Sequence, residues 1–362
     1  MSRNKLPLDQ VLQGNCVDIL RTLPAHSVDL IFADPPYNLQ LQKELRRPNQ
    51  TVVDAVDDSW DQFHGFSDYD AFTKAWLSEA RRVLKKTGTI WVIGSYHNIF
   101  RVGKIMMDLG FWFLNDVIWH KTNPMPNFRG TRYTNATETL IWAKRSEDQK
   151  KYTFNYRAMK NLNGEKQMQN VWHIPLCTGA ERIKVNGRKA HSTQKPETLL
   201  YRVILSSSNE GDIVLDPFFG TGTTGAVAKR LGRRFIGIER DEAYVQVARE
   251  RIDNVEAIDN LQQLETPSVR GLPRVPFGRL IESGLLQPGQ TLYDKTRTHC
   301  AVIKLDALLK CGEVTGSIHA LATKLQGGSS NGWDFWHYED ENGALHAIDM
   351  LRSRYRQMFN LV

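Results

Sequence analysis

The stretch that most limits the possible folds is residues 212–241, "DIVLDPFFGTGTTGAVAKRLGRRFIGIERD". It begins as an apolar strand, turns at closely spaced glycines, continues with helical periodicity and ends in a second apolar strand. Two strands joined through a helix in this way lie parallel in one sheet. The sequence therefore predicts an α/β domain with a mostly parallel sheet.

Apolar strands alternate with amphipathic helices through the first 256 residues, and the pattern then changes. The helix that starts at residue 69 is expected to end at "KKTG", where basic residues and a glycine follow its last apolar positions. Strands are predicted at 28–33, 89–94, 114–119, 139–143, 212–216 and 235–239, and helices at 69–85, 97–109, 196–208, 223–231 and 241–253.

Two polar segments divide the chain. Residues 38–66 have no periodicity, as expected for a functional or mobile insertion, and residues 257–277 contain three prolines, as expected for a linker. We therefore expect a first domain over residues 1–256 and a small second domain over residues 278–362.

The glycine-rich turn predicts a nucleotide-like ligand. Gly220, Gly222 and Gly225 match the pattern G-x-G-x-x-G, and Glu239 follows at the distance of a ribose ligand. This pattern fits NAD as well as other adenosine cofactors, and structural glycines in a packed turn are a further alternative. Asp216 closes the strand before the turn, where a carboxylate would repel a pyrophosphate. S-adenosylmethionine carries an ammonium, a sulfonium and a ribose, and these groups suit a chain with an acidic residue at the end of each strand, Asp216 and Glu239.

A second strand ends in a similar way at "IFADPPYN", residues 31–38. The exocyclic amine of a nucleobase is a poor nucleophile because its lone pair is delocalised into the ring. Asp34 and a carbonyl of Pro35 or Pro36 offer two acceptors for the amine, which favour a pyramidal nitrogen and stabilise the cation that forms. Tyr37 can stack on a base extruded from the duplex. A simple proline turn that starts with aspartate is the alternative.

Positive charge is concentrated in residues 121–200, which hold 15 lysines and arginines against 6 acidic residues. The whole chain has a net charge of +7, so the rest of it is slightly acidic. A confined basic excess favours a polyanion such as DNA, although a solvated basic surface gives the same count. The candidates for phosphate contacts in the DNA-facing segment 121–195 are Lys121, Arg129, Arg132, Arg182, Lys184, Arg188 and Lys189, and Asn123 is the candidate for capping the base pocket.

Other features argue against several classes of protein. The four cysteines, at positions 16, 177, 300 and 311, have no metal-ligand spacing and indicate reduced thiols in a cytoplasmic protein. No stretch approaches the roughly 18 apolar residues of a membrane span. The chain lacks the Pro-Cys dipeptide needed for methylation at the 5-carbon of cytosine. Transfer to nitrogen needs no metal, and none is expected.

Three motifs together resemble those of amino-group DNA methyltransferases: "DPPYN" at 34–38, "HSTQKP" at 191–196 and "DPFFGTGTT" at 216–224. Their order, with the catalytic motif first, is similar to that of the β class. The match extends through "GSYHNIFRVG", "NPMPNFRGTR" and the C-terminal unit to the cell-cycle-regulated adenine methyltransferases, over nearly the whole chain. The resemblance implies a circularly permuted, seven-stranded Rossmann-like sheet in which the strands that end at Asp34 and Asp216 are neighbours.

The resemblance also implies how S-adenosylmethionine is held. Phe218, Gly220 and Gly222 would cradle its methionine part, and Glu239 would hold its ribose. This chain has Gly14-Asn15-Cys16 where the family often has Gly-Asp-Cys, but Asn15 can still accept from the adenine amine of the cofactor. The full predicted set is Asn15, Cys16, Asp34, Thr193, Gln194, Lys195, Asp216, Phe218, Gly220, Gly222, Thr223, Thr224, Glu239 and Arg240.

The C-terminal unit is predicted to be a small α+β domain. A short helix is expected after Gly316-Ser317, and an aromatic strand is expected between turns at Asn331-Gly332 and Asn342-Gly343. Aromatic residues at such positions are more often part of a core than of a stacking platform. The segment resembles the methylase-associated domain, which implies DNA recognition by Ser317, His319, Asn331 and Trp333.

The sequence thus predicts a site-specific methyltransferase that modifies N6 of a flipped adenine in double-stranded DNA. The resemblance implies the site GANTC, a cytoplasmic, nucleoid-associated setting and a homodimer. A cytosine-N4 methyltransferase is the first alternative, although such enzymes usually carry serine in place of Asp34. A nicotinamide-dependent oxidoreductase and a catalytically inactive DNA-binding protein are the others.

Overall fold

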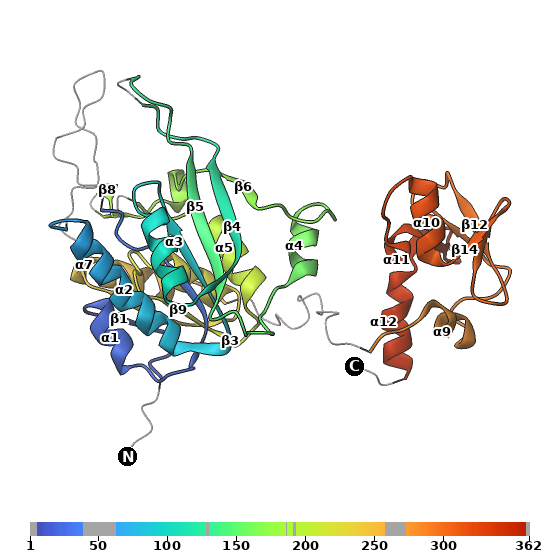
Figure 1. The fold of residues 1–362 in the computed structure, drawn as a ribbon, viewed down its shortest axis with the longest axis horizontal. Helices are drawn as coiled ribbons and strands as arrows, with labels where there is room; N and C mark the ends of the chain where they lie inside the picture. Colours follow the sequence, from blue (N-terminus) through green and yellow to red (C-terminus); the bar gives the residue numbers. More distant parts are fainter. Residues whose placement is uncertain are drawn as a thin grey trace, which may run out of the picture. The chain divides into compact units, whose positions relative to one another are not determined.

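The computed structural model describes residues 6–38, 63–127, 130–185, 187–190, 193–257 and 273–359. The chain divides into two compact units, Met1–Pro267 and Ser268–Val362 (Figure 1). Most of the predicted insertion 38–66 and of the predicted linker 257–277 lies outside the described residues.

The described part of the first unit is built on one eight-stranded sheet. Strand β5 runs against both of its neighbours, and every other pair of neighbouring strands is parallel. The order is β1 (Gln10–Gln13), β10 (Arg234–Glu239), β9 (Ile213–Asp216), β2 (Val28–Ala33), β3 (Leu84–Gly94), β5 (Thr137–Lys144), β4 (Trp112–Lys121) and β6 (Val171–Ile174). The prediction that the strands ending near Asp34 and Asp216 are neighbours is confirmed, since β2 pairs with β9 through Leu30 and Ile31. Strand β6 adds an eighth strand at the edge of the expected seven-stranded sheet.

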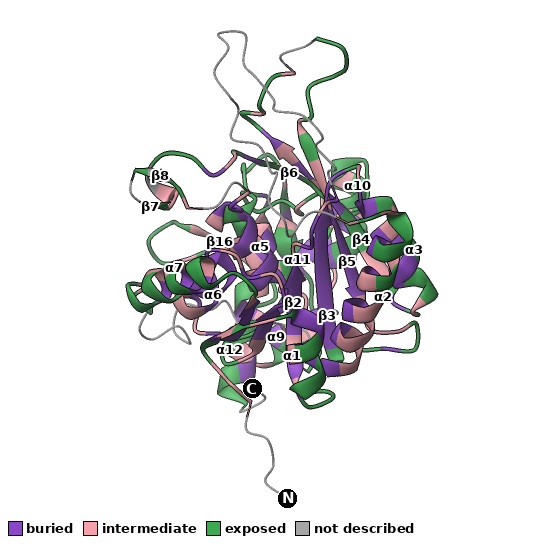
Figure 2. Cartoon of the chain, turned by 90° about the vertical axis from the view of Figure 1, so that its left-hand side faces the viewer, coloured by how far each residue is buried: buried purple, intermediate pink, exposed green. Residues whose placement is uncertain are grey.

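Helices cover both faces of this sheet because its central strands are apolar on both sides. In β2, Leu30 and Phe32 pack into one core and Ile31 and Ala33 into the other, as the alternation of side chains along a strand requires. Figure 2 shows these central strands buried between helices with exposed outer sides. The first core also contains residues of α5 (Glu197–Ser207), α6 (Thr223–Arg230) and α7 (Glu242–Asp253), and the second contains residues of α1 (Cys16–Thr22), α2 (Phe66–Val83) and α3 (Ile99–Asp108).

One helix boundary predicted from the sequence is wrong. Helix α2 ends at Val83, and the "KKTG" stretch lies inside strand β3 instead of ending the helix. Pairing between the strands outweighs the local signal, because Leu84 already adopts an extended conformation and pairs with Val28 of β2. The sheet therefore gains a long strand beside the one that leads into "DPPYN".

Two smaller features follow the central sheet. Helix α4 (Tyr156–Leu162) packs against α5, and the 3-10 turn η2 (Gly179–Glu181) leads into a basic hairpin. The hairpin pairs β7 (Lys184–Val185) with β8 (Arg188–Lys189) in an antiparallel two-stranded sheet.

The second unit is an α+β domain, as predicted. Its antiparallel sheet has the order β14 (Val314–Gly316), β13 (Leu309–Cys311), β12 (Cys300–Ile303), β11 (Thr291–Tyr293), β15 (His337–Glu339) and β16 (Leu345–Ala347). The described helices of this unit are α9 (Phe277–Glu282), α10 (Ile318–Gln326), α11 (Gly332–Phe335) and α12 (Asp349–Met358).

The helix predicted after Gly316-Ser317 is confirmed as α10, with Ser317 as its N-cap. The aromatic strand predicted to start near Trp333 is wrong, because Gly332–Phe335 form helix α11 and the strand begins only at His337. Asn331 caps α11 with its side chain and so starts a helix where the sequence suggested a hairpin turn.

Candidate active site and cofactor cavity

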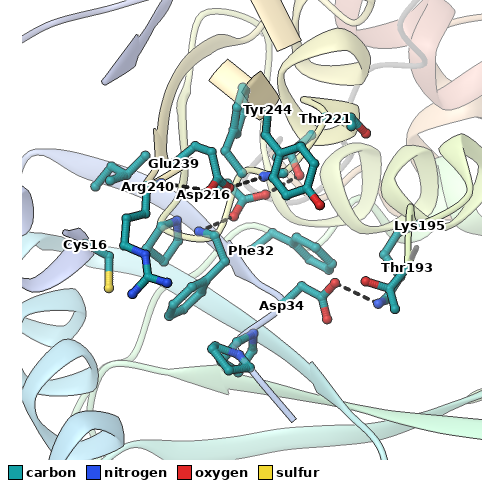
Figure 3. A pocket seen from close by; sticks show the side chains of 18 of the residues that line it. Cys16, Phe32, Asp34, Thr193, Lys195, Asp216, Thr221, Glu239, Arg240 and Tyr244 are labelled. Atoms are coloured by element: carbon teal, nitrogen blue, oxygen red, sulfur yellow. Dashed lines mark hydrogen bonds and ion pairs between the residues drawn. The ribbon is translucent and has the colours of Figure 1, made fainter. Parts of the chain in front are cut away.

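Three carboxylates gather at the carboxyl ends of three neighbouring strands. Asp34 directly follows β2, Asp216 ends β9, and Glu239 ends β10. All three line one cavity, whose wall also contains the aromatic side chains of Phe32 and Tyr244 (Figure 3). Open α/β sheets bind ligands at this edge because loops and helix N-termini meet there.

Asp216 is buried at the floor of the cavity and has two donors. One carboxylate oxygen accepts from the backbone N–H of Phe218 at 2.9 Å, and the other from the hydroxyl of Thr224 at 2.6 Å. Burial raises the pKa of Asp216 to about 7, although both hydrogen bonds lower it. A cationic ligand group nearby would favour the ionised form of this carboxyl.

Glu239 is held by backbone donors. Its carboxylate accepts from the N–H groups of Gly220 at 2.8 Å, Arg240 at 2.7 Å and Asp241 at 2.9 Å. A carboxylate has about four lone-pair positions, so one acceptor position stays available for a ligand hydroxyl. Burial raises the pKa of Glu239, with the backbone hydrogen bonds acting in the opposite direction.

Gly222 shapes the turn and does not line the cavity. Its φ of 77° is in the left-handed region, and a Cβ at this position would lie 2.9 Å from Cβ of Ala248 in α7. The glycine therefore serves the turn and the close approach of α7. Of the other predicted cofactor residues, those that line the cavity are Asn15, Cys16, Asp34, Thr193, Gln194, Lys195, Asp216, Phe218, Gly220, Thr223, Thr224, Glu239 and Arg240.

Several lining residues were not predicted. Phe63 lies in the predicted insertion 38–66, just before α2, and Phe72 lies in α2; neither is part of a motif that pointed to this cavity. Phe32 and Pro217 lie next to predicted residues and could have been included. The remaining ones are Gly14, Leu200, Phe219, Thr221, Ile238 and Tyr244.

The segment after β1 combines a helix cap with an unreactive thiol. The side-chain oxygen of Asn15 accepts from the N–H of Val17 at 2.9 Å and so caps α1. Burial raises the pKa of the Cys16 thiol to about 12, which leaves it protonated at neutral pH. Cys16 is therefore a wall of the cavity and not a nucleophile.

Asp34 lies between an ammonium and a phenol. The Nζ atom of Lys195 is 2.7 Å from one carboxylate oxygen, and the hydroxyl of Tyr37 donates to the other at 3.0 Å. Burial raises the pKa of Asp34, and the charge of Lys195 partly offsets this. Lys195, predicted to contact the cofactor, thus contacts the predicted catalytic carboxylate in this structure (Figure 3).

The prolines differ in the use of their carbonyl groups. The carbonyl of Pro36 accepts from the hydroxyl of Tyr69 at 2.9 Å and from the side-chain amide of Asn98 at 3.4 Å. These contacts fix the backbone after Asp34 and occupy the Pro36 carbonyl. Pro35 directly follows Asp34 in the sequence, and both residues line the cavity.

Glu138 and Lys121 complete this cluster from strands β5 and β4. Lys121 lies 2.8 Å from one carboxylate oxygen of Glu138, and the hydroxyl of Tyr37 lies 2.9 Å from the other. Glu138 was not predicted, because no local motif marks it. Lys121 was predicted to clamp a DNA phosphate, but in this conformation its ammonium is buried in an ion pair and does not face solvent.

The "HSTQKP" motif also organises the chain next to the basic hairpin. Gln194 is buried, and it accepts from the N–H of Ile183 at 3.1 Å and donates to the carbonyl of Glu181 at 2.9 Å. Glu181 in turn accepts from the N–H of Glu197 at the start of α5. Gln194 therefore ties the base of the hairpin to the motif that lines the cavity.

The remaining predicted DNA contacts have varied surroundings. Arg132 is exposed and donates to the hydroxyl of Tyr96, and Asn123 accepts from the N–H of Leu176 at 2.7 Å. In the basic hairpin, Lys184 and Lys189 are exposed, and the preceding Arg182 is half-buried. Arg129 and the side chain of Arg188 lie outside what the structure describes. The phosphate contacts of this segment stay predictions.

In the second unit, the four residues predicted to face DNA have structural contacts. Ser317 and Asn331 cap helices, and the N–H of Gly332 donates to the His319 ring at 3.0 Å. Trp333 is only 9% exposed and packs in the core of the unit. This agrees with the expectation that aromatic residues in this segment are more often part of a core than of a stacking platform. DNA contacts by these four residues stay predictions.

The described residues contain no group of three His, Cys, Asp or Glu side chains that could hold a metal ion. Within those residues, no helix is long and apolar enough to cross a bilayer. The donor set of the cavity fits S-adenosylmethionine instead: buried carboxylates match its cationic end and its ribose hydroxyls, and aromatic side chains line the wall. Fold and site together define an S-adenosylmethionine-dependent methyltransferase.

Comparisons with known proteins place the chain within this class. A family model described as DNA methylase matches residues 28–250, and a model described as Restriction Enzyme Adenine Methylase Associated matches residues 259–360. The chain therefore belongs to the DNA methylase family.

Curated relatives extend the match over almost the full length. The chain is 51% identical to Type II methyltransferase M.HinfI of Haemophilus influenzae over 350 residues, covering 96% of this chain and 97% of that protein. It is 42% identical to Type II methyltransferase M2.DpnII of Streptococcus pneumoniae over 252 residues, covering 70% of this chain and 91% of that protein. The prediction of a DNA adenine methyltransferase that uses S-adenosylmethionine is confirmed by these matches.

Solved structures share the fold of the first unit. The complex of M1.HpyAVI with SAM has a TM-score of 0.50 and 27% identity, over 67% of this chain and 98% of that one. The cytosine-N4-specific PvuII DNA methyltransferase has a TM-score of 0.52 and 23% identity, over 70% of this chain and 90% of that one. Similarity at this level of identity extends to the fold alone.

Proposed function

We propose that this chain methylates N6 of an adenine that has left the DNA duplex, within the sequence GANTC, and that Asp34, Pro35, Pro36 and Tyr37 form its catalytic site. The observation that carries the proposal is the position of two carboxylates, Asp34 and Asp216, at the ends of neighbouring strands in one cavity. One strand end binds the methyl donor and the next binds the base.

The donor side is anionic. Asp216 would accept from the ammonium of the bound cofactor, and Glu239 would accept from one of its ribose hydroxyls. When bound, S-adenosylmethionine supplies a methyl group on a sulfonium; its C–S bond breaks, the electron pair stays on sulfur, and a C–N bond forms at the base. Phe218 and Gly220 line the turn against which the methionine part lies.

The acceptor side activates the amine. One N–H of the adenine amine donates to the Asp34 carboxylate and the other to the Pro35 carbonyl, because the Pro36 carbonyl is already occupied by Tyr69 and Asn98. These acceptors localise the nitrogen lone pair that attacks the methyl group. The methylated nitrogen then loses a proton to Asp34 and from there to solvent. The ring of Tyr37 stacks on the base.

The DNA is held by the exposed cations of the basic segment, and the second unit contributes to site selection. Arg132, Lys184 and Lys189 are the exposed candidates for phosphate contacts. The match of that unit to methylase-associated domains supports its role. A homodimer, a cytoplasmic setting near the nucleoid and a link to replication and the cell cycle are parts of the proposal that rest on the family resemblance alone.

The Asp34→Ala variant tests the catalytic assignment. We expect DNA binding to be retained while the methylation rate falls by about 10²- to 10⁴-fold, because the amine loses one of its two acceptors. Near-normal turnover would show that this carboxylate does not assist the amine. Sequencing of modified bases in DNA treated with the purified protein tests the substrate: N4-methylcytosine, or N6-methyladenine outside GANTC, contradicts the proposal.

A further inference from the structure

Four charged side chains and one phenol form a buried cluster, of which the proposed reaction uses only a part. Asp34, Tyr37 and Lys195 belong to the predicted site, whereas Lys121 was predicted only as a phosphate contact and Glu138 has no assigned role. The side chains of Lys121 and Glu138 are 9% and 11% exposed, and those of Lys195 and Asp34 are 8% and 17% exposed. Ions so far removed from water are stable only when each is matched by a partner.

Both oxygens of the Asp34 carboxylate already have a partner. Lys195 contacts one at 2.7 Å, and the hydroxyl of Tyr37 contacts the other at 3.0 Å. An ammonium at this distance weakens the carboxylate as an acceptor for an incoming amine. It also repels the positive charge that develops on the amine during methyl transfer. The reactive arrangement therefore requires Lys195 to move away from Asp34.

Glu138 is placed to receive both partners of Asp34. Its Oε2 atom lies 3.8 Å from Nζ of Lys195, so a movement of about 1 Å brings that pair to hydrogen-bond distance. The same oxygen lies 2.9 Å from the hydroxyl of Tyr37, which has one hydrogen and donates to one carboxylate at a time. Lys121 holds the other oxygen of Glu138 at 2.8 Å.

The strand arrangement explains why Glu138 lies there. Strand β5 is antiparallel to β3 and β4, so its start meets the carboxyl ends of those strands. Burial alone would raise the pKa of Glu138, but Lys195 and Lys121 outweigh it and lower the pKa below its ordinary value. Glu138 is therefore ionised at neutral pH and can hold a second ammonium.

We infer that Glu138 is a positioning residue for methylation: when the target amine binds Asp34, Lys195 and the hydroxyl of Tyr37 shift to Glu138. This inference rests on the proposed role of Asp34 as the acceptor for the amine. Lys195 then pairs with Glu138 instead of with Asp34. The Asp34 carboxylate is left free to face the amine without a competing cation.

The test is the Glu138→Gln variant of the full-length protein. Single-turnover methylation of a GANTC duplex is measured at saturating S-adenosylmethionine, and the dissociation constants of cofactor and duplex are measured separately. We expect the rate to fall by about 100-fold because Asp34 stays paired with Lys195, while both dissociation constants change by less than about threefold. An unchanged rate, or a loss confined to binding, overturns the inference.

A matched control is the Asp29→Asn variant. Asp29 pairs with Lys85 at 2.7 Å and lies near the start of strand β2, at the opposite edge of the same sheet. Its loss removes an ion pair of the same sheet whose side chains are more exposed, 38% for Lys85 and 16% for Asp29, and we expect a normal methylation rate. If this variant slows methylation as much as Glu138→Gln does, general destabilisation explains both effects and the inference fails.

A double-variant cycle tests the mechanism itself. In a Lys195→Met background, Glu138→Gln should change the rate by less than about threefold, because no ammonium remains to be transferred. A full, additive effect overturns the inference. If Glu138→Gln alone does not fold, because it leaves Lys121 unpaired, the Lys121→Met/Glu138→Gln variant replaces it with the same expected outcomes.

These results separate the two proposals. If Asp34→Ala is slow and Glu138→Gln is normal, only the role of Glu138 fails. If Asp34→Ala turns over normally, the proposed catalytic site fails, and the role of Glu138 fails with it.

Discussion

Acidification should weaken cofactor binding through Asp216. In the ligand-free protein, burial raises the pKa of this carboxyl to about 7, and the donors of Thr224 and Phe218 only partly oppose the shift. The ammonium of S-adenosylmethionine binds the ionised form, so binding is strong above this pKa and is lost as the pH falls through it. If only the ionised form binds, the dissociation constant rises by about sixteenfold between pH 7.0 and pH 5.5.

Isothermal titration calorimetry over this pH range measures the effect. An α-amino group titrates near pH ~7.7–8.0, so the cofactor stays protonated below pH 7 and Asp216 dominates the change. Repeating the titration at pH 5.5 in buffers of different ionisation enthalpy should show close to one proton released on binding. A dissociation constant that is flat over this range, or no proton release, refutes the reasoning.

Two variants assign the titration to Asp216. Thr224→Val removes the hydroxyl that donates to the carboxylate at 2.6 Å, so it should raise the pKa and move the pH transition upward. Asp216→Asn should weaken binding at pH 7 and abolish the dependence on pH. If the dependence persists in Asp216→Asn, the titrating group is elsewhere in the cavity, and Asp34 or Glu239 would then be examined.

Three further outcomes are expected. Gly222→Ala should lower the free energy of unfolding by about 1–3 kcal/mol, because the residue has a φ of 77° and its Cβ would lie 2.9 Å from that of Ala248. Thermal unfolding measures this loss. Gly65→Ala is the control, because a Cβ at that position has no atom near it. Removal of residues 278–362 should weaken DNA affinity or site selection more than cofactor binding, and an unchanged affinity and site preference in a gel-shift assay would contradict this. Arg132→Ala should weaken DNA binding equally for all sequences and reduce the slope of log affinity against log salt by about one, whereas a sequence-dependent loss would indicate base contact.

Sequence reasoning succeeded where local signals determine structure. The apolar runs before Asp34 and Asp216 predicted two buried strands, and the family motifs placed those strands side by side, which their pairing confirms. Most of the predicted cofactor residues line one cavity because they follow strand ends that meet at one edge of the sheet.

It failed where distant segments decide the outcome. "KKTG" carries the signals of a helix end, yet pairing with β2 draws it into a strand. The segment at Trp333 has the composition of a strand, but the cap at Asn331 starts a helix there. Glu138 comes near Asp34, with which it shares Tyr37 and Lys195 as partners, only through the reversed direction of β5, and no local pattern of residues encodes that arrangement.

The pairing of β2 with β9 has a mechanical consequence. Adjacent strands in a sheet are about 4.8 Å apart, a spacing fixed by backbone hydrogen bonds and not by side chains. In this register Asp216 lies level with Phe32, and Asp34 follows two residues later, so the backbone of the sheet fixes the offset between the residue proposed to hold the methyl donor and the residue proposed to hold the nitrogen that receives the methyl group. The relative positions of these two backbone segments are therefore insensitive to most substitutions in the cavity, and variants there should alter affinity and charge more readily than alignment.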